Sequence, residues 1–495
     1  MSKLAPIILT LTLASLAASQ SLKRQASSFL AFRHITVIDM TGAPARQDMT
    51  VLIKAHRIVR VAQSARLKLP ESTQVINGTD KYLIPGLWDM HAHTRLDRVT
   101  REIVFPLNIA SGVTGLRVMA GDCIGEGGCA TREPFAIQLK WKKEIALGKL
   151  IGPRLVISST YIDGPHPLNL GSVVVKNADE ARMAVRAAKR KGVDFIKIHN
   201  NLSRESYFAL ADEAGKVRIP FAGHVPWVVS AIEAANSGQK SEEHLFGVLE
   251  SCSDHEKELL ISRERLTTMA GDHFDEVRDL VQKQRDLLSY AANCNALFAA
   301  LIKNRTWIVP TFNYWRVTAE FSFFDSPRVQ DDSRLRYVPL TITKRWSELL
   351  NRALPKISQD EITLSRERFR ERLAFVKRLH DAGVGILPGT DPDVIFTVPG
   401  FNLHDELRMF VDGGLTPMEA LQTATRDSAE YLNMAESLGT IEPGKFADLV
   451  VLDANPLDDI SNTTRIAGVV LNGRYFSPSE LSKMMIAVQL AAARN

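Results

Sequence analysis

Eight short apolar runs alternate with helical patterns between residues 85 and 436, and no other feature constrains the fold of this chain as strongly. Each run has the length of a buried strand, and the stretches between the runs place apolar residues on one face of a helix. Repeated strand and helix units favour a parallel α/β sheet, and eight of them over roughly 350 residues predict a (β/α)8 barrel of the TIM type. We expect the strands at residues 87–91, 115–119, 154–158, 195–198, 220–223, 241–244, 307–311 and 384–388.

The two ends of the chain have a different pattern from the middle. Short β-branched stretches separated by turn residues fill residues 29–84, and similar stretches return in residues 437–476. They predict one small β-sandwich domain built from both termini, with a barrel domain at residues 85–436 between its two parts. Residues 477–495 have a helical pattern, and we expect this helix to dock on its own barrel; the alternative is a contact in a homo-oligomer.

Residues 1–19 have the pattern of a secretory signal peptide. Lys3 precedes an apolar run at residues 4–18, and small residues follow at the expected cleavage site. The run is shorter than the roughly 20 residues of a membrane-spanning helix, so an uncleaved anchor is the less favoured alternative. We therefore expect a secreted protein, periplasmic in a Gram-negative cell, with no stable membrane insertion once the signal is removed.

The four cysteines agree with export from the cytosol. Cys123 and Cys129 flank a glycine-rich segment that lets them meet, and we expect a disulfide between them. Cys252 and Cys294 are either a second bridge, closing an insertion, or two separate buried thiols, because the sequence does not give their distance.

Composition excludes several other classes of protein. Of the 495 residues, 45% are hydrophobic and 24% are charged, values that do not suit a disordered, collagen-like or polytopic membrane chain. The net charge is only +5, and the charges alternate along the sequence. We expect a small-molecule substrate and no nucleic-acid partner.

Polar residues end several of the predicted barrel strands, where a barrel of this type carries its chemistry. His91 and His93 end the first strand and point to the same face, so that they can bind one cation. His224 and His244 end the fifth and sixth strands, and imidazole ligands of this kind suit zinc. Asp391 follows the eighth strand, where it could bind a metal and accept a proton from a water molecule.

Lys197 lies between apolar neighbours in the fourth predicted strand, where an unpaired charge is costly. One solution is a salt bridge or a side chain that reaches solvent. The other is a lowered pKa and reaction with carbon dioxide, which gives a carbamate able to bridge two metal ions.

These residues together resemble the amidohydrolase superfamily, and most closely its imidazolonepropionase- and prolidase-like branch. The resemblance rests on His91-Ala92-His93 after Leu83-Ile84-Pro85-Gly86, on Lys197, His224, His244 and Asp391, and on the closing run at residues 439–450. It implies a metal-dependent hydrolase that acts on carbon–nitrogen bonds, and it favours the carbamate at Lys197.

The resemblance also implies a role for each of these residues. His91, His93 and Asp391 would hold the more buried of two divalent ions, His224 and His244 the more exposed one, and the Lys197 carbamate would link them. Zinc is the first choice, and manganese, cobalt or iron are alternatives. A hydroxide between the ions would attack an amide of a dipeptide or N-acyl amino acid, or a related ester or carbamate, and Asp391 would be the catalytic proton carrier.

One departure from the family pattern narrows the choice of reaction. Residues 225–227 after His224 are Val-Pro-Trp, whereas deaminases of the superfamily have a glutamate there, so a nucleobase deaminase is disfavoured. Two alternatives stay open: a mononuclear hydrolase of cyclic amides or lactones, and a non-catalytic binding protein with the same barrel. Candidates for substrate binding offer ring faces and polar groups near strand ends; they are Tyr161, His166, His199, Trp227 and Tyr314.

Overall fold

The computed structural model describes residues 29–120, 135–167, 169, 171–267, 294–319, 332–353, 358–392 and 394–494. The predicted signal peptide at residues 1–19 and the predicted Cys123–Cys129 bridge lie outside these residues. No helix within them combines the length and the apolar character that crossing a membrane requires.

Seven parallel strands form most of a barrel, which confirms the predicted (β/α)8 class. A short segment around Ile386 takes the eighth position: Ile308 donates to the Gly385 carbonyl at 2.9 Å, and Met90 donates to the Pro388 carbonyl at 2.8 Å. The segment thus joins the last strand to the first. The strands are, in chain order, β6 (Leu87–Ala92), β7 (Val113–Val118), β8 (Arg154–Asp163), β10 (Phe195–Ile198), β11 (Phe221–Gly223), β12 (Ser241–Glu243) and β13 (Trp307–Val309), with β9 (Val173–Val174) paired to β8.

Local sequence signals set the ends of the helices around the barrel. Asn177 caps the helix α5 (Ala178–Lys191) by accepting from the Glu180 amide, and Gly192 ends it with φ 81°. The sheet-facing side of α5 is buried, as its pattern predicts. The other helices of the barrel region are α2 (Asp97–Val99), α3 (Phe105–Ala110), α4 (Phe135–Ala146), α6 (Arg204–Lys216), α7 (Ala231–Asn236), α10 (Asn295–Asn304), α11 (Phe312–Ala319), α13 (Gln359–Asp381), α14 (Phe401–Asp412), α15 (Pro417–Gln422) and α16 (Ser428–Tyr431).

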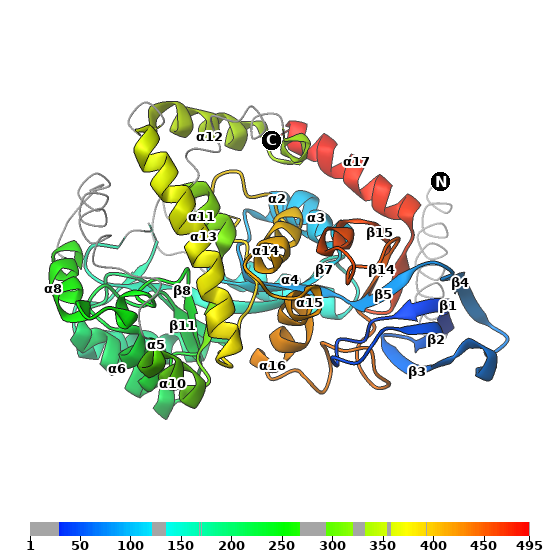
Figure 1. The fold of residues 1–495 in the computed structure, drawn as a ribbon, viewed down its shortest axis with the longest axis horizontal. Coiled ribbons are helices and arrows are strands. Elements are labelled where there is room, and N and C mark those ends of the chain that lie inside the picture. Colours follow the sequence, from blue (N-terminus) through cyan, green and yellow to red (C-terminus); the bar gives the residue numbers. More distant parts are fainter. Residues whose placement is uncertain are drawn as a thin grey trace, which may run out of the picture.

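Strands from both chain ends form one mixed eight-stranded sheet beside the barrel (Figure 1). The pairing of Val450 with Ile84 joins the C-terminal strands to the N-terminal ones, so the predicted composite β-domain is confirmed. Its order is β16-β15-β14-β5-β1-β2-β3, and β4 also pairs with β1. The strands are β1 (Phe29–Val37), β2 (Arg46–Lys54), β3 (Arg57–Gln63), β4 (Thr73–Asn77), β5 (Tyr82–Pro85), β14 (Leu449–Leu452), β15 (Ile466–Leu471) and β16 (Arg474–Phe476).

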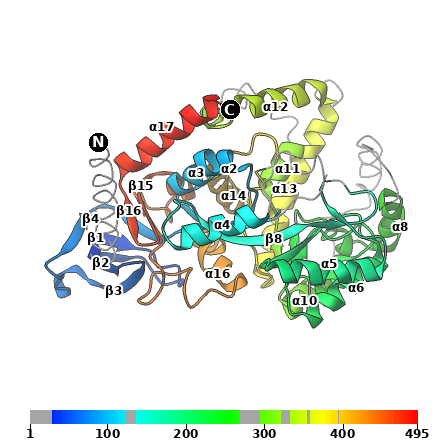
Figure 2. The same cartoon turned by 180° about the vertical axis from the view of Figure 1, so that it is seen from behind.

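The C-terminal helix α17 (Pro478–Arg494) packs on its own chain, as expected (Figure 2). Val488 and Ala492 of α17 are buried in one apolar cluster with Ile103 and Leu107 of the barrel region.

Two insertions add helices to the barrel. The insertion between β12 and β13 contains α8 (Glu256–Thr267), and the insertion after α11 contains α12 (Leu340–Ala353).

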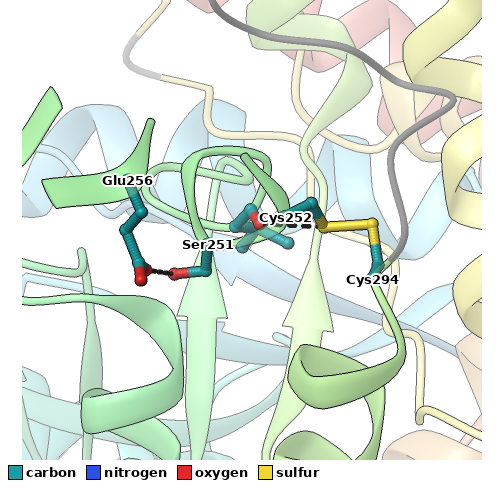
Figure 3. Close-up of a disulfide and its surroundings, with 5 residues drawn as sticks. Ser251, Cys252, Glu256 and Cys294 are labelled. Carbon is teal, nitrogen blue, oxygen red and sulfur yellow. Dashed lines mark hydrogen bonds between the residues drawn. A yellow bond between two sulfur atoms is a disulfide. The ribbon is translucent and has the colours of Figure 1, made fainter. Parts of the chain in front are cut away.

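A disulfide joins the two ends of the insertion that follows β12. Cys252 and Cys294 are 42 positions apart and their Cα atoms lie 4.7 Å from each other, which decides between the two alternatives in favour of a bridge (Figure 3). Next to Cys252, the Ser251 hydroxyl donates to Glu256 of α8 at 2.6 Å (Figure 3). The insertion is therefore tied down at its base, close to the end of β12.

Candidate metal centre

Two histidines and an aspartate meet where β6 and the eighth segment end. His93 Nε2 lies 3.0 Å from Asp391 Oδ1, and His91 Nε2 lies 3.9 Å from the same oxygen. All three side chains are buried, and their ligand atoms lie within 4.8 Å of one another. This is a group of three ligands of the kind that holds a single divalent cation.

The backbone bends sharply around this group. Asp391, His244 and Thr311 have φ values of 49°, 64° and 47°, a left-handed region that costs non-glycine residues about 1–2 kcal/mol each. Such strained residues cluster at functional sites. A Cβ on Gly389 would lie 2.5 Å from the His91 Cβ, so the bare glycine backbone lets the eighth segment approach the metal-binding side chains.

Lys197 and two further histidines complete the cluster. Lys197 is 1% exposed and pairs in β10 with Ala222 of β11, two residues before His224. The ring centroids of His224 and His244 are 4.7 Å apart, and those of His91 and His244 are 4.6 Å apart. All six predicted ligands therefore lie in one buried cluster.

Hydrogen bonds fix the orientation of the His224 and His244 rings. His244 Nδ1 lies 2.7 Å from the Thr311 hydroxyl, and His224 Nδ1 contacts the side-chain oxygen of Asn200. Metal-binding histidines are typically held this way through the nitrogen that does not bind the metal. In both rings Nε2 is thus the nitrogen left for a cation.

A buried ionic chain lies behind His91. His91 Nδ1 is 2.8 Å from Glu243, and Arg117 Nη2 donates to both carboxylate oxygens of Glu243, at 2.7 and 2.9 Å. Arg117 also donates to the Tyr431 hydroxyl at 2.6 Å, and Ser241 donates to Glu243 at 2.5 Å. The charges of Arg117 and Glu243 are thus paired with each other, and this pairing offsets the free energy that burying each charge costs.

Burial keeps the imidazoles of His91, His224 and His244 neutral. It lowers the pKa of His91 to about 4 and lowers the pKa values of His224 and His244 well below their ordinary range. Burial alone would raise the pKa of Asp391, but His91 and His93 hold it below its usual value, so the carboxylate is charged. Neutral imidazoles beside a charged carboxylate are the donor set that zinc and similar divalent ions prefer, so these residues fit a metal.

Comparison with known proteins finds a family model and relatives that are similar to this chain. Residues 334–475 match the sequence model of the amidohydrolase family. The C-terminal part of the chain is therefore similar to amidohydrolases in sequence. The chain is 22% identical to the ochratoxinase of Aspergillus niger over 423 residues, which cover 76% of this chain and 71% of the relative.

Solved structures share the fold of this chain. Bottromycin amidohydrolase aligns with a TM-score of 0.71 at 20% identity, covering 96% of this chain and 93% of the other. A Xaa-Pro dipeptidase crystallised with methionine in its active site aligns with a TM-score of 0.62 at 19% identity, covering 91% and 100%. The predicted resemblance to amidohydrolases is confirmed by the family match over residues 334–475 and by the shared fold.

The predicted substrate-binding residues lie at different distances from the cluster. The His199 ring lies 4.1 Å from the His224 ring and 5.2 Å from the Tyr161 ring, and its Nδ1 is 3.3 Å from Asp163. Trp227 lies 6.0 Å from Phe246, which itself contacts His224 and His244. The main-chain carbonyl of His166 accepts a hydrogen bond from the Asn201 side chain. Among the described residues, the His166 ring has no ring contact with any histidine of the cluster.

Sequence reasoning missed the residues that support the ligands. Glu243 directly precedes His244, and Arg117 interrupts an apolar strand as Lys197 does. An arginine and a glutamate in two buried strands could have predicted a pair, because neither is stable alone in such a place. Phe246 has no such signal in the sequence, since an aromatic residue after a strand is usually part of a core.

Proposed function

We propose that this protein is a binuclear metal-dependent hydrolase of amide bonds in dipeptides or N-acyl amino acids, or of related ester or carbamate bonds. The observation that carries the proposal is the convergence of His91, His93, Asp391, Lys197, His224 and His244 from five strand ends into one buried cluster. The names of similar proteins add support, since an ochratoxinase, a bottromycin amidohydrolase and a Xaa-Pro dipeptidase are among them.

The proposal gives each residue of the cluster a role in metal binding or in proton transfer. His91, His93 and Asp391 would hold one divalent cation, most simply zinc, His224 and His244 a second, and a carbamate formed from the Lys197 amine and carbon dioxide would lie between them. When bound, such ions lower the pKa of water toward neutrality and polarise a substrate carbonyl. Asp391, kept charged by its histidine neighbours, takes the proton from the attacking water and returns it to the departing amine.

One observation favours a second candidate. Among the described residues, the only group of three histidine, cysteine or carboxylate side chains whose ligand atoms lie close enough for one cation is His91, His93 and Asp391. A mononuclear hydrolase of cyclic amides or lactones would need no more than this group. The number of ions per chain separates the two proposals.

The experiment is a hydrolysis screen of the zinc-loaded protein against N-acyl amino acids, dipeptides, lactones and carbamates. The Asp391→Asn variant, loaded in the same way, is the matched control. We expect turnover of at least one amide by the wild type and none above background by the variant. Absence of turnover with every class, from a protein that holds its metal, would contradict the proposal.

We also propose that the protein is exported. The apolar run at residues 4–18 and the Cys252–Cys294 disulfide support this, because disulfides persist in oxidising compartments. N-terminal sequencing of the mature protein from the medium or periplasm should find a chain that begins near residue 20. An intact Met1 on a cytosolic protein would contradict it.

A further inference from the structure

Four aromatic side chains gather beside the two histidines of the second predicted metal position. We call Trp227, Phe246, Tyr314 and Trp315 the aromatic wall. The Phe246 ring lies 5.3 Å from His224 and 5.2 Å from His244, and the Tyr314 ring lies 5.2 Å from His244. Phe246 also contacts the other three members, at 5.6 to 6.0 Å between ring centroids.

The aromatic wall differs from the aromatic core next to it. Phe312, at the start of the same helix α11, is fully buried and packs on Phe369 and Phe410 in the interior. All four members of the wall are instead partly exposed, although they contact histidines that are only 8% and 2% exposed. Large rings that stay partly exposed directly above buried, polar groups are typical of a surface that receives a ligand.

Hydrogen bonds and cation–π contacts hold the wall in place. Trp315 Nε1 donates to the His244 carbonyl at 2.7 Å, and the Arg372 guanidinium lies 3.4 Å from the Trp315 ring centroid. On the other side, Arg263 lies 5.6 Å above the Trp227 ring and is itself paired with Glu250. A wall ordered before binding loses little entropy when a ligand arrives.

Arg263 belongs to α8, so the insertion closed by the Cys252–Cys294 bridge contributes a side chain that contacts the wall. The rings themselves come from three different places, the segments after β11 and β12 and the helix α11. Contributions from several strand ends are what a barrel uses to shape its substrate site.

We infer that the aromatic wall determines substrate specificity, and that the preferred substrate carries an aromatic ring close to the scissile carbon–nitrogen bond. The inference rests on the proposed amide hydrolysis, and it restricts the proposed substrates to amides that carry an aromatic ring. A ring stacked against or edge-on to Phe246 and Trp227 would lie beside His224 and His244, where the reacting carbonyl has to be. The chemistry is the same whether the ring is on the acyl or on the amine side of the bond.

The test compares kcat/KM of the zinc-loaded protein for three substrates. N-acetylphenylalanine has its ring on the amine side, N-benzoylalanine has it on the acyl side, and N-acetylalanine has none. We expect at least one aromatic substrate to exceed N-acetylalanine by about 10-fold or more. Which of the two does so identifies the side on which the ring lies.

The Trp227→Leu variant should lose most of this preference, because its kcat/KM should fall much further for the aromatic substrate than for N-acetylalanine. Phe246→Leu is a second variant should the first fold poorly, and its zinc content is measured because Phe246 contacts His224 and His244. Tyr475→Leu is the matched control: Tyr475 is a partly exposed aromatic residue of the terminal β-domain, and its loss should leave the preference unchanged.

Equal kcat/KM for the aromatic and aliphatic substrates, or a preference that survives both wall variants, would overturn the inference. If no amide is hydrolysed, the proposed function fails, and binding then tests the wall by itself. Isothermal titration of zinc-loaded Asp391→Asn with N-acetylphenylalanine, N-benzoylalanine and N-acetylalanine should show tighter binding of an aromatic ligand. Equal affinity for all three ligands would refute the inference that the aromatic wall selects aromatic ligands, whether or not any amide is hydrolysed.

Discussion

Replacing Glu243 by glutamine should destabilise the fold of this protein and weaken metal binding at the proposed centre. The carboxylate is fully buried and accepts hydrogen bonds from Arg117, Ser241 and, through Nδ1, His91. An amide of the same shape removes the negative charge and leaves Arg117 as a buried, unpaired cation. Breaking a buried pair from one side costs about 3–5 kcal/mol.

The same change should loosen the metal site. Removing the partner of a metal-binding histidine typically weakens metal affinity by about 10- to 100-fold. The free energy of unfolding of the metal-free protein in urea measures the first effect. Titration of the metal-free protein with zinc measures the second, and it does not depend on any assumed substrate.

A double variant separates the two effects. Adding Arg117→Met to Glu243→Gln removes the unpaired cation, so part of the lost stability should return. Zinc affinity should stay low, because the partner of His91 is still missing. A Glu243→Gln protein whose unfolding free energy lies within about 1 kcal/mol of wild type, and whose zinc affinity is unchanged, would refute the reasoning.

Three further predictions follow from the buried cluster. Asp391→Asn should lower kcat by about 10²- to 10⁴-fold with KM little changed, as steady-state kinetics will show; a defect confined to KM would remove the proton-transfer role. Lys197→Ala should abolish hydrolysis and regain part of it with short carboxylic acids in the assay, whereas undiminished activity would exclude the bridging carbamate. Burial lowers the pKa of His91 from 6.5 to about 4, so on acidification the unfolded chain takes up this proton before the folded chain does. The free energy of unfolding of the metal-free protein should therefore fall as the pH drops from about 6.5 to about 4. For this one group the fall is at most about 1.4 kcal/mol per pH unit. The profile of His91→Asn should be flatter there, and identical profiles for the two proteins would contradict the assignment.

The parts of the fold that follow from local pattern could be predicted from the sequence. The two-residue spacing of His91 and His93 gives their common face, and the predicted strand at 195–198 coincides with β10. By contrast, β8 continues to Asp163, well past the predicted end at residue 158, because its polar stretch has no apolar alternation. The eighth strand, predicted at 384–388, is reduced to a single bridge at Ile386.

The support of the site depends on contacts between distant segments. Arg117 and Glu243 are 126 positions apart, and Thr311 reaches His244 across 67 positions. No local periodicity encodes such pairs, and only the closed barrel brings them together. The bridge between Cys252 and Cys294 could not be chosen from sequence for the same reason, since it depends on a Cα separation of 4.7 Å.

Metal content tests the central proposal most directly. The protein is stripped with a chelator, loaded with zinc in bicarbonate buffer, freed of unbound metal and analysed for zinc per chain, with the mass of the Lys197 peptide or intact chain measured in parallel. We expect two ions per wild-type chain, one or fewer after Lys197→Ala, and a carbon dioxide adduct on Lys197. One ion per wild-type chain with an unmodified Lys197, or none at all, would contradict the binuclear centre.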